Sequence, residues 1–208
     1  MIAIIDYGMG NLRSVQKGFE KVGYEAVVTA DPKIVLEAEK VVLPGVGAFR
    51  DCMRNLEEAG FVEPILRVIR EGRPFLGICV GLQLLFTGSE EFGYYEGLNV
   101  IPGRVVRFPV GMTEGGEVLK VPHMGWNQLA IKRRPPAFAD LEDGANVYFV
   151  HSYYVAPDDP SVIATTTRYG MEFCSSVWKD NVVGTQFHPE KSQEKGLGIL
   201  RNFAGQKS

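Results

Sequence analysis

The sequence predicts an α/β protein built on an open, mainly parallel sheet that is flanked by helices and extended by antiparallel strands. In the first half of the 208 residues, short β-branched runs alternate with segments of helical periodicity. In the second half, strand-like runs follow one another between Gly and Pro turns. The composition, 45% hydrophobic and 23% charged, is typical of a globular chain with one sizeable core.

The elements of the first half follow a strand, helix, strand order. Strands are predicted at residues 2–5, 26–28, 40–43 and 75–78. The first helix is predicted by apolar residues at helical spacing: Leu12, Val15, Phe19 and Val22. A second helical stretch covers about residues 49–70, where Gly60 and Pro64 are expected to break it, and a further helix begins near Val80. Parallel strands need such crossover helices, which cover both faces of the sheet.

The second half has a different pattern. Strands are predicted at residues 105–108, 147–150, 162–165 and 182–185, and some of them are expected to pair antiparallel. A last amphipathic helix carries apolar residues at Leu197, Leu200 and Phe203. Because neither an internal repeat nor a linker interrupts the chain, residues 1–208 are predicted to form a single domain.

Charge and cysteine content narrow the class of function. The chain has 22 basic and 25 acidic residues, and its longest basic cluster is residues 132–134, so no nucleic-acid partner is expected. The apolar N-terminus lacks the features of a signal peptide and no segment is long enough to span a membrane, which predicts a cytoplasmic protein without membrane contact. Three cysteines without CxxC spacing indicate neither a disulfide framework nor a zinc site, so no metal is expected.

One glycine-rich segment near the start is similar to a phosphate-binding loop. In Tyr7-Gly8-Met9-Gly10-Asn11, however, the position of the third glycine of a dinucleotide fingerprint is Arg13. We therefore reject a dinucleotide site there, and no cofactor is expected.

The stretch G-I-C-V-G at residues 77–81 places Cys79 between two glycines, directly after a predicted strand and before a predicted helix. Gly77 and Gly81 allow the sharp strand-to-helix turn that exposes a nucleophile at the carboxyl end of a sheet. At the helix N-terminus the dipole and the free N–H groups favour a thiolate, and the N–H of Val80 can point at an oxyanion. Free cysteines are more often small buried hydrophobes, which is the expectation for Cys52 and Cys174.

A nucleophilic cysteine needs a base, and the chain has three histidines, His123, His151 and His188. His188 begins the triplet His-Pro-Glu. Proline keeps the preceding residue out of the helical region, so side chains two positions apart can face the same side and Glu190 can orient His188. A histidine at a strand end beside a solvated glutamate is the alternative.

The glycine-rich loop at residues 44–49 follows the predicted strand 40–43 and lies at the same sheet edge as Cys79. Its backbone N–H groups can complete an oxyanion hole. By itself the loop is equally consistent with an ordinary turn.

The motifs G-I-C-V-G-L-Q, F-H-P-E-K-S-Q and L-P-G-V-G-A-F together resemble the class I (triad) glutamine amidotransferases, whose fold is flavodoxin-like. Three further stretches resemble the glutaminase subunits of imidazole glycerol phosphate synthases: D-Y-G-M-G-N at residues 6–11, P-H-M-G-W-N at 122–127 and F-V-H-S-Y-Y at 149–154. The similarity covers essentially the whole chain, from Ile4 to Phe203.

The resemblance implies a role for each matching residue. Cys79 is the nucleophile, His188 the general base and acid, and Glu190 its orienting carboxylate. The implied oxyanion hole consists of Gly47, Val80 and, after its peptide reorients, Val46; Gly45 and Gly47 are expected to make that reorientation sterically cheap. The implied glutamine-binding residues are Gly47, Gln83, Glu91, Ser152 and Tyr153. The implied partner interface consists of Asn11, Pro122, His123, Met124, Gly125, Trp126, Tyr148 and Lys191.

The resemblance also implies a reaction and a partner. L-glutamine is hydrolysed to glutamate and ammonia, and a (β/α)₈-barrel cyclase subunit in a heterodimer uses the ammonia to convert PRFAR to imidazole glycerol phosphate and AICAR in histidine biosynthesis. Glutaminase activity is expected to stay low until the cyclase ligand binds.

Three alternatives remain at this point. The chain could be a class I glutaminase serving anthranilate, guanylate or pyridoxal phosphate synthesis, although the P-H-M-G-W-N stretch argues against these. It could be a stand-alone γ-glutamyl hydrolase or cysteine peptidase, which would need no partner. A non-catalytic binding module would be expected to lack Cys79, His188 or Glu190, and all three are present.

Overall fold

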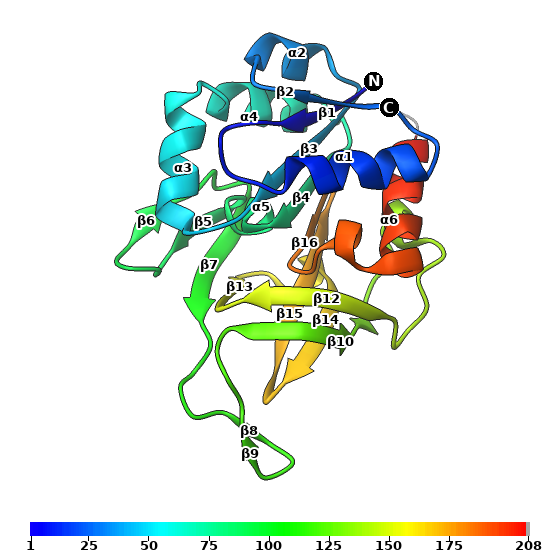
Figure 1. Ribbon diagram of the computed structural model, residues 1–208. Helices are drawn as coiled ribbons and strands as arrows, with labels where there is room; N and C mark the ends of the chain where they lie inside the picture. Colours follow the sequence, from blue (N-terminus) through cyan, green and yellow to red (C-terminus); the bar gives the residue numbers. More distant parts are fainter. Residues whose placement is uncertain (207–208) are drawn as a thin grey trace.

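The computed structural model describes residues 1–206, so the last two residues of the predicted domain lie outside the described part (Figure 1). Its centre is a parallel sheet in the order β2-β1-β3-β4-β16. The strands are β1 (Ile2–Ile5), β2 (Ala26–Thr29), β3 (Lys40–Gly45), β4 (Phe75–Cys79) and β16 (Val182–Thr185). Every residue of β1, β3 and β4 is buried, which explains why these strands are apolar runs without alternation.

Helices cover both faces of this parallel sheet, as Figure 1 shows. On one face α1 (Leu12–Lys21) packs against α6 (Gln193–Gly205), with Phe19 against Phe203. On the other face α2 (Pro32–Glu37) packs against α4 (Val62–Arg70), with α3 (Phe49–Glu58) beside them. The helix predicted from the spacing of Leu12, Val15 and Phe19 is confirmed, and Val15 and Phe19 are buried.

The helical stretch at residues 49–70 breaks at one of the two predicted positions. Gly60 lies between α3 and α4 with φ of 73°, a conformation that favours glycine. Pro64, by contrast, does not break a helix, because it lies in the first turn of α4, where its missing N–H costs no intrahelical hydrogen bond.

Beyond β16 the same sheet continues with further strands, most of which pair antiparallel. Next to β16 follow β15 (Met171–Lys179), β13 (Tyr153–Pro157), β7 (Ile101–Arg107), β5 (Phe86–Ser89) and β6 (Tyr95–Glu96). Strand β15 also pairs with β14 (Ile163–Tyr169), which pairs with β11 (Ala130–Ile131). The predicted α/β class with a mixed sheet is confirmed. Strand β16 joins its two parts, since it is parallel to β4 and antiparallel to β15.

Smaller elements complete the fold. Strands β8 (Thr113–Glu114) and β9 (Glu117–Val118) form a hairpin, and three 3-10 turns are η1 (Pro136–Phe138), η2 (Pro160–Val162) and η3 (Pro189–Lys191). The helix predicted near Val80 is only α5 (Val80–Gln83). It ends early: the carbonyl of Leu84 accepts a hydrogen bond from the N–H of Leu98, and that of Leu85 accepts from the N–H groups of Val100 and Ile101, instead of continuing the helix. Within residues 1–206, no helix has the length and apolar character needed to cross a membrane.

A two-stranded ribbon of β10 (His123–Gln128) and β12 (Asn146–His151) lies beside the carboxyl ends of the parallel strands (Figure 1). Its register places His123 opposite His151. The ribbon and the parallel sheet therefore meet where the candidate site lies.

Candidate active site

Cys79 is the last residue of β4 and the residue before α5, and its backbone is in the left-handed region with φ of 57°. The two flanking glycines make this turn possible. A Cβ on Gly81 would lie 1.9 Å from the carbonyl oxygen of Leu43, and a Cβ on Gly77 would lie 2.8 Å from that of Gly81. The backbone strain at Cys79 is of the order of 1–3 kcal/mol, which the packing around the turn must offset.

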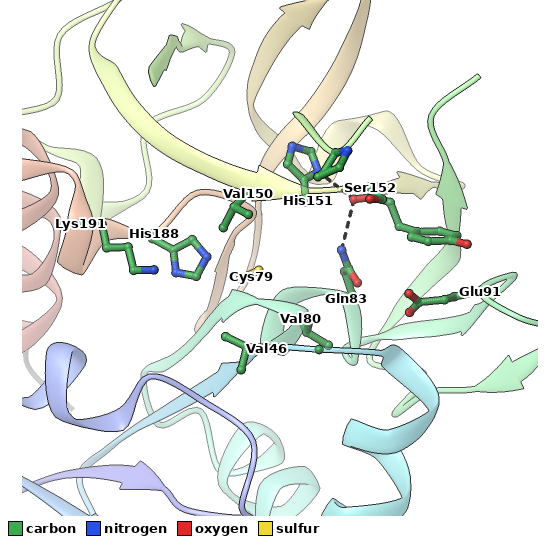
Figure 2. Close-up of a pocket in the computed structure, with 13 residues that line it drawn as sticks. Val46, Cys79, Val80, Gln83, Glu91, Val150, His151, Ser152, His188 and Lys191 are labelled. Carbon is green, nitrogen blue, oxygen red and sulfur yellow. Dashed lines mark hydrogen bonds between the residues drawn. The ribbon is translucent and has the colours of Figure 1, made fainter. Parts of the chain in front are cut away.

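The cysteine opens into a cavity of about 280 Å³ (Figure 2). Three chain segments converge there: the loop after β3, the turn after β4 and the segment after β16. The register brings them together, because Gly45 pairs with Cys79, and Ile78 pairs with Thr185. All residues predicted to act in catalysis or glutamine binding line the cavity except Glu190: Val46, Gly47, Cys79, Val80, Gln83, Glu91, Ser152, Tyr153 and His188.

Glu190 lies behind His188 and accepts a hydrogen bond of 2.8 Å from its Nδ1. The exposed fractions of the two side chains are 2% and 1%. Ser192 fixes the segment, since its hydroxyl donates to the carbonyl of His188 and accepts from the N–H of Tyr148. The interpretation of His-Pro-Glu as a site in which the carboxylate orients the imidazole therefore agrees with this geometry.

The other ring nitrogen of His188, Nε2, is buried and has no hydrogen-bond partner among the described residues. In Figure 2 the ring lies beside the sulfur of Cys79. Burial alone would lower the pKa of His188, but the neighbouring Cys79 and Glu190 outweigh it and raise the pKa above its ordinary value. The arrangement favours an imidazolium next to the cysteine, where a base for a nucleophilic cysteine is needed.

Gln186 is a site residue that the sequence analysis missed. Its amide nitrogen lies 3.8 Å from the sulfur of Cys79, and its amide oxygen accepts a hydrogen bond of 3.0 Å from Gln83. The sequence contains a signal for Gln186: it is two residues before His188, and residues two apart in an extended segment face the same side.

Glu91 is held at one side of the cavity. One carboxylate oxygen accepts a hydrogen bond of 2.7 Å from the N–H of Phe49, the first residue of α3, and the hydroxyl of Ser89 accepts from the N–H of Glu91. The second carboxylate oxygen remains available to the cavity.

The end of β3 and the loop after it are held by two side chains that the sequence analysis did not connect with them. The hydroxyl of Tyr7 donates to the carbonyl of Pro44 at 2.8 Å, and the thiol of Cys52 donates to the carbonyl of Val46 at 3.3 Å. Burial raises the pKa of Cys52 to about 11, so it stays a donor at neutral pH. As expected, Cys52 and Cys174 are buried, with the pKa of Cys174 raised to about 12 by burial.

The residues predicted to meet a partner have different environments. Met124 and Trp126 are 62% and 48% exposed, and Pro122 and Lys191 are exposed at the mouth of the cavity. Tyr148 lies between Trp126, at 6.0 Å between ring centroids, and the ammonium of Lys191, at 5.9 Å.

The remaining predicted interface residues are less accessible. Asn11 at the start of α1 and Gly125 in β10 are half-buried. His123 is 3% exposed and packs among aromatic rings, so it presents no surface to a partner in this structure. The reason is the alternation of β10, in which His123 points inward while Met124 and Trp126 share the opposite, exposed face.

Known proteins resemble this chain both in sequence and in fold. The family model of class I glutamine amidotransferases matches residues 3–206. A crystal structure titled glutamine amidotransferase has a TM-score of 0.74 at 17% identity, covering 99% of this chain and 100% of that one. The structure of PurLQS from Thermotoga maritima also has a TM-score of 0.74, at 18% identity, covering 97% and 96%. The chain belongs to the class I glutamine amidotransferases.

Curated relatives of similar sequence show which family within that class the chain belongs to. The chain is 82% identical over 206 residues to the imidazole glycerol phosphate synthase subunit HisH of Geobacter sulfurreducens, covering 99% of both chains. It is 54% identical over 201 residues to the subunit of the same name from Aquifex aeolicus, covering 96% and 94%. Within the class it is therefore a member of the HisH family.

Proposed function

We propose that this protein is the glutaminase subunit of an imidazole glycerol phosphate synthase, and that Cys79, His188 and Glu190 carry out the hydrolysis of L-glutamine. The observation that carries the proposal is the placement of Cys79 on a strained turn beside the unbonded Nε2 of His188, whose Nδ1 is bonded to Glu190. This is the nucleophile, base and orienting group of a triad.

In the first half-reaction the thiolate of Cys79 attacks the side-chain amide carbon of glutamine. The oxyanion that forms is stabilised by backbone N–H groups of Gly47 and Val80, with Val46 contributing after its peptide reorients; one such donor is worth about 3 kcal/mol. The imidazolium of His188 gives its proton to the departing nitrogen. Ammonia leaves, and a glutamyl thioester remains on Cys79.

In the second half-reaction water attacks the thioester while neutral His188 takes its proton. Glutamate leaves, the thiolate returns and His188 is again an imidazolium. Glu190 keeps its charge throughout and stabilises the cation in both steps. One glutamine and one water give one glutamate and one ammonia.

The polar groups on the far side of the cavity from His188 suit the amino-acid end of glutamine. Gln83 Oε1 and the second oxygen of Glu91 provide acceptors for the ammonium group, while Ser152 and Tyr153 would hold the carboxylate end. The side-chain amide then extends toward Cys79. A cavity of about 280 Å³ is of the size needed for one amino acid.

Ammonia released into neutral water would become ammonium, which is no nucleophile, so the product must be delivered before it is protonated. We propose that a cyclase subunit covers the cavity and receives it, forming a heterodimer that converts PRFAR to imidazole glycerol phosphate and AICAR in histidine biosynthesis. Pro122 and Lys191 are exposed at the mouth of the cavity, and the exposed Met124 and Trp126 follow Pro122 in β10, which supports the proposal.

We also propose that residues 1–208 act as one domain in the cytoplasm. A continuous buried core supports the first part, since both sheet regions contribute to it. The three cysteines, which are free in the structure, support the cytoplasmic location.

The experiment that tests the function is glutamate release from glutamine by the purified chain, alone and with the cyclase subunit and its nucleotide ligand. We expect strong release in the complete mixture and its loss in Cys79→Ala. Full activity without a partner would support a stand-alone hydrolase instead. No activity with this partner, but activity with another synthase, would change the acceptor and keep the triad.

A further inference from the structure

The buried pair His123 and His151 takes no part in the proposed chemistry, yet it is hydrogen-bonded to the wall of the cavity. Nδ1 of His123 and Nε2 of His151 are 2.9 Å apart, and Nδ1 of His151 is 2.8 Å from the carbonyl oxygen of Tyr153. On the other side, Nε2 of His123 is 3.2 Å from the amide nitrogen of Asn127. The two rings thus link β10 with the segment that begins β13.

The direction of these bonds is fixed at one end by Tyr153. Its carbonyl can only accept, so Nδ1 of His151 carries a hydrogen. If His151 is neutral, its Nε2 is an acceptor, and Nδ1 of His123 must then be the donor.

The direction is also fixed at the other end by Asn127. Its Oδ1 accepts from the N–H of Gln128 at 2.8 Å, and its Nδ2 donates to the carbonyl of Arg168 at 2.9 Å. The amide nitrogen is therefore the group that faces His123, and Nε2 of His123 must accept from it. Both ends demand the same arrangement: two neutral imidazoles, each with its hydrogen on Nδ1.

A proton cannot be added to either ring without breaking a hydrogen bond. A cation at His151 would place its Nε2–H against the Nδ1–H of His123, and moving that hydrogen to Nε2 would place it against the amide of Asn127. The surroundings are apolar: Phe108, Phe149 and Phe173 pack on the pair. Burial lowers the pKa of His123 to about 4 and that of His151 to about 3, in agreement with the geometry.

The chain of hydrogen bonds continues to the glutamine site through Tyr153. Its carbonyl accepts a second bond, of 3.2 Å, from Nε2 of Gln83, and the same nitrogen donates to Gln186 at 3.0 Å. Both amide hydrogens of Gln83 are then used. Figure 2 shows the amide oxygen of Gln83 turned toward Glu91.

We propose that His123 and His151 are positioning residues of the glutaminase site: they hold the Tyr153 carbonyl so that Gln83 presents its oxygen, not its NH₂ group, to the ammonium end of the substrate. The inference rests on the proposed function, because it assumes that the cavity binds glutamine. Without the pair, the carbonyl is free to move and the Gln83 amide can turn over, which would place donors against an ammonium group.

Three variants of the protein in complex with the cyclase subunit and its ligand test this role. His151→Asn keeps a donor near the place of Nδ1 and should leave KM for glutamine within about threefold of wild type. His151→Gln loses that donor and should raise KM about tenfold with kcat changed less than threefold, as expected for loss of a substrate contact made in both ground and transition states. Phe173→Leu disturbs the same packing without touching the hydrogen bonds and serves as the control.

Equal KM in the Gln variant and the wild type, or equal increases in the Asn, Gln and Leu variants, would overturn the positioning role. If the His151 variants do not fold, the ¹⁵N imidazole spectrum of wild type decides: Nδ1–H on both rings supports the arrangement, and Nε2–H on either ring contradicts it. Absence of glutamine hydrolysis by the wild-type complex would instead overturn the proposed function and the positioning role with it.

Discussion

Two buried histidine sites lie on either side of the cavity and differ in charge. His188 has a carboxylate on Nδ1 and a cysteine near Nε2, and its pKa is raised. His151 has a carbonyl on Nδ1 and a second imidazole on Nε2, and its pKa is lowered. Both residues are at most 6% exposed.

The difference shows that the hydrogen-bond partner, and not burial, decides what a histidine does in this protein. Burial disfavours the cation at both sites. Only at His188 does a negative neighbour outweigh that cost, and only there is a mobile proton useful. At the other site a fixed hydrogen position is useful, because it sets the direction of a hydrogen-bond chain.

The largest expected effect, on kcat, comes from removing the negative charge beside His188, which makes its surroundings resemble those of the neutral pair. Glu190→Gln keeps the size of the side chain and removes its charge, so the pKa of His188 should fall and the wrong tautomer can form. We expect kcat for glutamine hydrolysis to fall by about 10³-fold or more, measured as glutamate release in the full complex. A variant with the wild-type rate would show that the carboxylate charge has no such role.

The second prediction compares the strained turn that carries Cys79 with the regular strands that carry the histidine pair. Gly81→Ala places a methyl group 1.9 Å from the Leu43 carbonyl, so the turn at Cys79 must move. We expect a loss of about 2–3 kcal/mol in the free energy of unfolding, measured by urea denaturation, together with loss of activity.

Gly198→Ala is the matched control, because Gly198 lies in α6 with nothing within 4 Å of its Cβ position. We expect it to be neutral or stabilising by up to about 1 kcal/mol. Equal stability of the two alanine variants would contradict the account of the turn. The histidine pair lies in the regular strands β10 and β12, so its imidazole signals should survive in a folded Gly81→Ala protein.

The third effect is the most gradual, because it is a change of stability with pH. His123 and His151 have lowered pKa values in the folded state, so the unfolded chain binds more protons as pH falls below about 6.5 and stability is lost from there toward pH 4. Each residue contributes a slope of up to about 1.4 kcal/mol per pH unit. His151→Asn should flatten the slope measured by urea unfolding between pH 6.5 and 4.5.

His188 has the opposite sign, since its folded-state pKa is raised. Its contribution is fully present below about pH 6.5 and is lost as pH rises through the raised value. A His188→Asn variant should therefore leave the acid slope unchanged, and an acid slope that falls equally in both variants would contradict the comparison.

The sequence predicts the first site better than the second, for a physical reason. Cys79 and His188 can be recognised from local motifs, a glycine-flanked turn and an X-Pro segment. These motifs fix the backbone geometry over a few residues. The contacts of His123 and His151 depend on the register of β10 and β12, which only the assembled ribbon defines. The pair was therefore not recognised, and His123 was expected at the surface.

The end of β3 and the loop after it show a similar limit for the two glycines predicted to be flexible. The sequence suggests conformational freedom for both Gly45 and Gly47. Gly47 does adopt a φ of 90°, but a Cβ on Gly45 would lie 2.8 Å from the N–H nitrogen of Gly81 and 2.9 Å from the Tyr7 hydroxyl. Close approach of two chain segments, which a sequence pattern does not reveal, is therefore the reason for glycine at that position.

The most direct test of the opposite charge states is a ¹⁵N imidazole spectrum of the wild-type protein at pH 7, assigned with one variant for each of the three histidines. The account predicts protons on both nitrogens of His188, and on Nδ1 alone of His123 and His151. A neutral His188, or a proton on Nε2 of either member of the pair, would contradict it.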